Sequence, residues 1–85
     1  MTTKDGTGAA ILQVDLNLPD HQIERVVAEH CSALGRVISV KVHRSPSVFA
    51  LIEMAKREQT YKLVSKFGGS TFGTSALIHL EQRPG

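Results

Sequence analysis

Hydrophobic and polar residues alternate along four segments of the chain, which is the pattern of strands that bury one face. In the third segment, Ala50, Ile52 and Met54 occupy every second position. In the fourth, Ala76, Ile78 and Leu80 do the same, which leaves Leu77, His79 and Glu81 on the other side. The predicted strands cover 11–16, 36–43, 48–54 and 75 to about 81.

Two other segments carry apolar residues at helical spacing. The first stripe consists of Ile23, Val26, Val27, His30, Cys31 and Leu34. Asp20 stands where a helix cap is expected, and Gly35 where the helix should end. The second helix is predicted over 56–67, with a stripe of Thr60, Leu63, Val64 and Phe67. Within the first stripe, we interpret His30 as a packed histidine and Cys31 as a buried, inert thiol.

The order βαββαβ predicts an α+β domain, a ferredoxin-like sandwich in which two helices cover one face of a four-stranded antiparallel sheet. A chain of 85 residues can form one core but no enclosed active-site cavity. We expect the domain over 10–82, a flexible tail at 1–9 and a short C-terminal tail at 83–85. The second face of the sheet stays open and is free to bind a partner.

Charge and cysteine content narrow the function classes only slightly. Ten Lys and Arg against eight Asp and Glu give a net charge of +2, which permits a polyanionic partner without requiring one. Cys31 is the only cysteine, which suits a reducing compartment. The opening residues lack the apolar core of a secretory signal, and no apolar run approaches the ~20 residues of a membrane span. We therefore expect an intracellular protein, nuclear or cytoplasmic, with no membrane partner.

The sequence also lacks the patterns typical of catalytic and metal-binding sites. The four histidines do not have metal-ligand spacing, and there is no C-x-x-C pair. Phosphate-binding loop and nucleophile-elbow motifs are missing as well. We expect no enzyme activity, no metal and no cofactor.

Several short motifs occur in an order that is found in one known family. Residues 35–42 read G-R-V-I-S-V-K-V, residues 49–54 read F-A-L-I-E-M, and residues 67–73 begin with F-G-G and end with F-G. Asn17-Leu18-Pro19 follows the first strand. Over roughly 10–82 the chain resembles the RNA-recognition-motif family. The resemblance implies that exposed aromatic residues on the first and third strands stack on the bases of single-stranded RNA.

The chain departs from the family at those aromatic positions, which fall on Gln13, Phe49 and Leu51. Ser47 stands where a basic residue is usual, and the turn at 44–47 is short. This short turn and the A-L-I-E-M strand are similar to polypyrimidine-tract-binding and hnRNP L-like domains, which use aliphatic and polar side chains, often against pyrimidines. The missing aromatic residues predict weak binding, and the resemblance to these domains implies a pyrimidine preference.

The candidate RNA-binding residues form a mixed surface, with Phe49 to stack on a base and two cations to contact phosphate. The set is Gln13, Lys41, His43, Arg44, Phe49, Leu51, Leu77 and His79. Two alternatives stay open. Leu51 and Leu77 also suit a protein-interaction or homodimer surface that binds no RNA. An ACT-type ligand-binding domain shares the βαββαβ order, although the turn at 17–20 lacks the glycine expected there.

Overall fold

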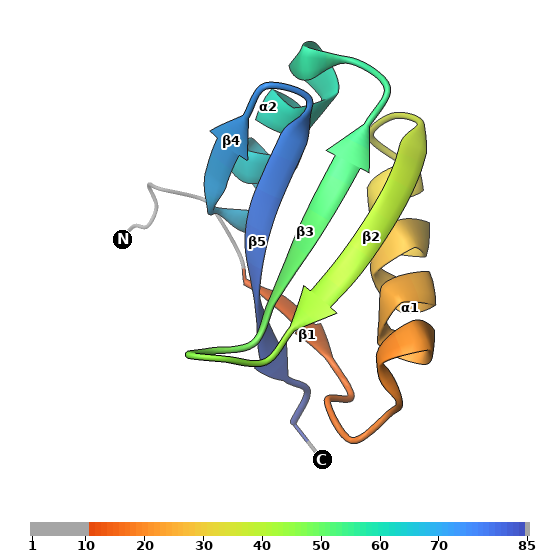
Figure 1. Cartoon of the computed structure of the whole chain (residues 1–85), viewed down its shortest axis with the longest axis vertical. Helices are drawn as coiled ribbons and strands as arrows, with labels where there is room; N and C mark the ends of the chain where they lie inside the picture. Colours follow the sequence, from red (N-terminus) through yellow and green to blue (C-terminus); the bar gives the residue numbers. More distant parts are fainter. Residues whose placement is uncertain (1–10, 85) are drawn as a thin grey trace, which may run out of the picture.

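The computed structural model describes residues 11–84, so the whole predicted N-terminal tail (1–9) and the last residue of the predicted C-terminal tail lie outside the described residues. Figure 1 shows the elements in space. In chain order they are β1 (Leu12–Val14), α1 (Asp20–Ser32), β2 (Val37–His43), β3 (Phe49–Met54), α2 (Arg57–Phe67), β4 (Ser70–Phe72) and β5 (Ser75–Gln82). Every predicted helix and strand is present, although β1 is shorter than predicted, and β4 is additional. Among the described residues, neither helix is long and apolar enough to cross a membrane.

The strands form one mixed sheet in the order β1-β5-β3-β2, with β4 pairing with β5 as a fifth strand. β3 is antiparallel to both β2 and β5, whereas β1 is parallel to β5. The fold is therefore a small α+β domain with two helices and a five-stranded sheet. The predicted four-stranded, fully antiparallel sheet is wrong in the number of strands and in the direction of β1.

The β4–β5 hairpin explains this difference. The predicted turn around Phe72 is a short strand followed by a two-residue loop, in which Gly73 has a φ of 62°, a positive value that suits the first position of a type II′ turn. The chain reverses there, so β5 returns antiparallel to its neighbour β3 and parallel to β1. β4 pairs with the first residues of β5 and β1 with the last, so both strands share one edge of β5.

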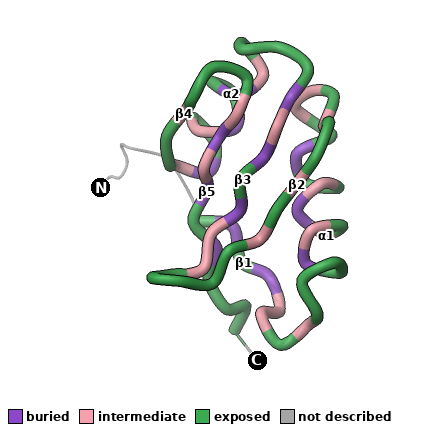
Figure 2. The backbone as a smooth tube through the Cα atoms, in the orientation of Figure 1, coloured by how far each residue is buried: buried purple, intermediate pink, exposed green. Residues whose placement is uncertain are grey.

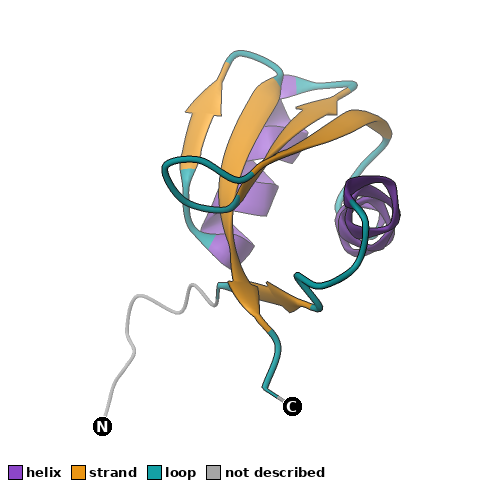
Figure 3. Ribbon diagram, turned by 60° about the horizontal axis from the view of Figure 1, so that its bottom comes forward, coloured by secondary structure: helices purple, strands orange, loops and turns teal. Residues whose placement is uncertain are grey.

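Both helices cover the same face of the sheet (Figures 1 and 3), and the core lies between the two layers. The buried positions alternate along β3 and β5 as predicted, which Figure 2 shows as a change of colour along each strand. From α1 the buried side chains are Ile23, Val27 and Cys31, whereas His30 is exposed. The prediction that His30 packs in the core is wrong, because the buried stripe follows steps of four residues and His30 lies about 100° to one side of it.

Candidate nucleic-acid interface

The register of the strands arranges the uncovered side chains of the sheet in rows. At one end, His43 of β2 pairs with Phe49 of β3, and Phe49 pairs with His79 of β5. The rings of His43 and Phe49 are stacked, with 5.0 Å between centroids and 19° between planes. Three ring-bearing side chains therefore stand side by side across three strands, and we call them the ring row.

The middle row is apolar at its centre and has one cation at its end. Leu51 of β3 lies between Lys41 and Leu77, and Ser70 of β4 follows beside Leu77. Leu51 is 36% exposed and Leu77 is half-buried. This row offers an aliphatic surface, with the Lys41 ammonium on the β2 side.

A third row carries a carboxylate and an exposed aromatic ring. In it, Ser39, Glu53, Ser75 and Phe72 lie on β2, β3, β5 and β4. Phe72 shares the face of its partner Ser75 and is 60% exposed. We use the name open face for these three rows together with Gln13 and Glu81, which pair with each other at the β1 edge.

Two carboxylates set the charge of the open face. Glu53 accepts hydrogen bonds from the hydroxyls of Ser75 and Thr74. These two bonds, that of Ser75 first, lower the pKa of Glu53 below its usual value, so the side chain is an anion at neutral pH. Glu81 accepts a hydrogen bond of 3.0 Å from the Gln13 amide. Across residues 11–84, Lys41 is the one lysine or arginine among the open-face residues, so two carboxylates outnumber one cation there.

Arg44 does not belong to the open face, although the sequence placed it among the phosphate-binding residues. Its Nε lies 2.8 Å from a carboxylate oxygen of Asp20, and its terminal nitrogens donate to the carbonyls of Leu16 (3.1 Å) and Leu18 (3.2 Å). The guanidinium therefore fastens the β1–α1 loop to the end of β2. The same contact corrects the predicted role of Asp20, since the helix cap is Pro19 and Asp20 pairs with Arg44 instead.

The structure thus brings six of the eight predicted residues together: Lys41, His43, Phe49, Leu51, Leu77 and His79. Gln13 is on the same face but at its far edge, next to Glu81. Phe72 was missed because the segment was interpreted as a turn. The signal was present, since Phe72 and Ser75 flank two residues that begin with glycine, as in many β-hairpins.

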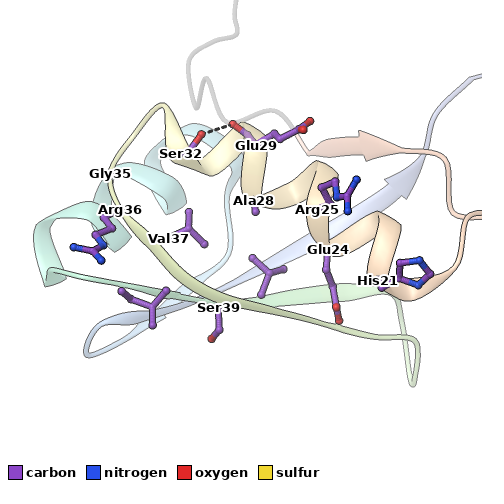
Figure 4. Close-up of a pocket in the computed structure, with 12 residues that line it drawn as sticks. His21, Glu24, Arg25, Ala28, Glu29, Ser32, Gly35, Arg36, Val37 and Ser39 are labelled. Atoms are coloured by element: carbon purple, nitrogen blue, oxygen red, sulfur yellow. Dashed lines mark hydrogen bonds between the residues drawn. The ribbon is translucent and has the colours of Figure 1, made fainter.

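A second hollow lies on another side of the domain, between α1 and the first half of β2 (Figure 4). One backbone N–H on the outer edge of β2, that of Val42, already has a partner, since it donates a 2.9 Å hydrogen bond to the Glu24 carboxylate. A register shift between Val37 and Ser39 interrupts the strand further along. Bulges and side chains of this kind protect edge strands from pairing with another chain. The hollow is therefore a shallow groove beside a protected edge.

No protein-family model matches the sequence, and no curated protein or solved structure is significantly similar to it. Within the part of the chain that the structure describes, no three potential metal ligands gather in one place.

Proposed function

We propose that the chain binds a short stretch of single-stranded RNA through the open face and catalyses no reaction. The observation that carries this proposal is the ring row of His43, Phe49 and His79. Flat rings on an uncovered sheet are the surface on which unstacked bases pack, at roughly 1–3 kcal/mol per base. Two bases at about 2 kcal/mol each correspond to a Kd near 1 mM, so the binding is weak.

The charges of the face shape how this binding should respond to salt. Because Arg44 pairs with Asp20, Lys41 is the cation left to contact an RNA phosphate, whereas the carboxylates of Glu53 and Glu81 repel a phosphate. One phosphate contact gives a slope of roughly −0.7 in a plot of log affinity against log salt concentration. We therefore expect a shallow salt dependence, in contrast to the steep one of a basic nucleic-acid-binding surface.

In terms of class, we infer an aromatic-poor variant of the RNA-recognition motif, on a fold related to the ferredoxin-like sandwich. The ordered motifs and the two helices on one face of the sheet support this inference. The β4–β5 hairpin and the parallel β1 are the features in which the chain departs from it. The similarity to polypyrimidine-tract-binding domains supports uridine and cytidine as the preferred bases.

The direct test is an NMR titration of the labelled protein with hexauridylate at low salt. We expect shifts of the amide signals at Lys41, Phe49 and His79, and Phe49→Ala should weaken binding by ~1–3 kcal/mol if its ring stacks on a base. Arg44→Ala is the matched control, because its side chain contacts the β1–α1 loop and should leave the affinity of the folded protein unchanged. Absence of shifts on the open face at millimolar RNA would overturn the proposal.

A second candidate function is association with a protein, including another copy of this chain, through the same face. The charge balance favours it, since two carboxylates and one lysine surround the apolar centre of Leu51 and Leu77. Sedimentation velocity separates the two functions. A dimer that persists at high salt and shows no amide shifts in the RNA titration would support this second function. A monomer at all concentrations would reject the homodimer.

A further inference from the structure

We infer that Phe72 is a second base-stacking platform, and that a bound RNA strand crosses the open face diagonally from Phe49 to Phe72. This inference rests on the proposed function and extends it, because it assigns a residue, a direction and a minimum length to the RNA. It starts from the exposure of Phe72, which at 60% is the highest among the large hydrophobic side chains of residues 11–84.

Three contacts hold Phe72 where a base could reach it. Its strand β4 pairs with β5, and Phe72 lies opposite Ser75, on the same side of the sheet as Leu77 and His79. The hydroxyls of Thr74 and Ser75 donate to Glu53, which fastens the end of the hairpin to β3. Within residues 11–84 the ring of Phe72 stacks on no other aromatic ring, and 60% of the residue is exposed to solvent.

The separation of the two rings sets the length of RNA that can touch both. Phe49 and Glu53 are four positions apart on β3, or about 13 Å, and β4 lies two strand spacings from β3, or about 9.5 Å. The diagonal is therefore about 16 Å, roughly the span of five stacked nucleotide steps of 3.4 Å, or of fewer steps when the strand is extended. A dinucleotide has a single step and cannot reach both rings, whereas a hexanucleotide can.

The side chains along this diagonal suit bases better than phosphates. Leu51 and Leu77 lie between the two rings, and Glu53 stands next to the Phe72 end as an anion. A phosphate close to Glu53 would be repelled, so the bases should face the sheet there while the sugar–phosphate backbone stays on the solvent side. Lys41 is beside Leu51 and can contact a phosphate near the middle of the strand.

The test compares diuridylate with hexauridylate on the wild-type chain and on Phe49→Ala, Phe72→Ala and Phe72→Tyr. We expect Phe72→Ala to lower the affinity for hexauridylate at least about 5-fold, the lower end of what one stacked base contributes, and to leave the affinity for diuridylate unchanged. Phe72→Tyr keeps a ring and should retain most of the affinity for hexauridylate. Phe49→Ala should lower the affinity for both oligonucleotides. Tyr61→Ala is the matched control, because Tyr61 is 55% exposed but lies on α2 in the helix layer.

Each outcome has a separate meaning. If Phe72→Ala binds hexauridylate like the wild type while Phe49→Ala does not, the inference is wrong and the proposed function stands. If the wild type binds neither ligand, the proposed function fails and the inference with it. If Phe72→Ala instead converts a dimer into a monomer that binds no RNA, Phe72 belongs to a protein interface and the inference is overturned.

Discussion

Replacing Glu24 with alanine should destabilise the domain and expose the edge of its sheet. Glu24 is on α1, and its carboxylate accepts a 2.9 Å hydrogen bond from the Val42 N–H of the edge strand β2. The bond is partly buried and joins the helix layer to the sheet. Glu24→Ala removes the acceptor, so the Val42 N–H either donates to water or has no hydrogen-bond partner.

The size of the effect follows from the type and surroundings of this bond. A hydrogen bond to a charged group contributes roughly 1.5–3 kcal/mol, and partial exposure places this one near the lower end, at about 1.5 kcal/mol. For a domain of this size, that corresponds to a fall in Tm of roughly 6–12 °C. Glu24→Gln keeps an acceptor oxygen and should lose less than half as much.

Circular dichroism melts measure the stability change, and sedimentation at increasing concentration measures association through the freed edge. Glu29→Ala is the matched control, because Glu29 lines the same groove (Figure 4) and is exposed. If Glu24→Ala melts within a degree or two of Glu29→Ala and stays monomeric, the Glu24–Val42 bond does not have the role assigned to it.

Two other predictions concern the backbone and the thiol. Gly69 has a φ of 118°, and an alanine Cβ there would lie 1.9 Å from the Leu77 carbonyl oxygen. Gly69→Ala should therefore lower the free energy of unfolding, measured by urea titration, by at least ~3 kcal/mol. Gly73→Ala, with a φ of 62° and open space around its Cβ, should cost only ~1–2 kcal/mol, and equal losses would contradict this account. Burial raises the pKa of Cys31 from 9.0 to about 11, so the folded protein should react with a thiol reagent at pH 8 only as fast as it opens. Because the unfolded chain releases this proton first, the contribution of Cys31 to stability should fall between about pH 9 and pH 11, and rapid labelling of the native state would refute the burial argument.

The alternation of apolar residues was enough to predict the layers of the fold. Ala50, Ile52 and Met54 are buried and Leu51 is exposed, as period-two patterning requires, and the helices end near their predicted glycines. Because side chains on one strand alternate strictly, this pattern also predicted which residues of β2, β3 and β5 face the open side. The six residues that the structure brings together were found this way.

Long-range partners were not visible in the sequence. Arg44 was interpreted as a phosphate ligand, but the acceptors that its guanidinium contacts, at Leu16, Leu18 and Asp20, are distant in the chain. The strand β4 has three residues, too few for an alternating pattern to stand out. The parallel pairing of β1 depends on the reversal at that hairpin, so it could not be predicted without β4.

The hairpin also changes how the missing aromatic residue at position 13 should be understood. By the resemblance, Gln13 occupies a stacking position on the first strand, and its identity suggests a lost binding site. In the structure β1 lies at the edge of the sheet beside Glu81, and the strand next to Phe49 is β5. The neighbour of Phe49 on that side is therefore His79, with His43 stacked on the other side.

An aromatic residue at position 13 would lie two positions along from this ring row and one strand away, so its absence leaves the row intact. The same reversal that moves β1 to the edge brings Phe72 onto the open face. The departure from the expected strand arrangement and the second ring of the proposed RNA path thus have a common structural origin in the β4–β5 hairpin.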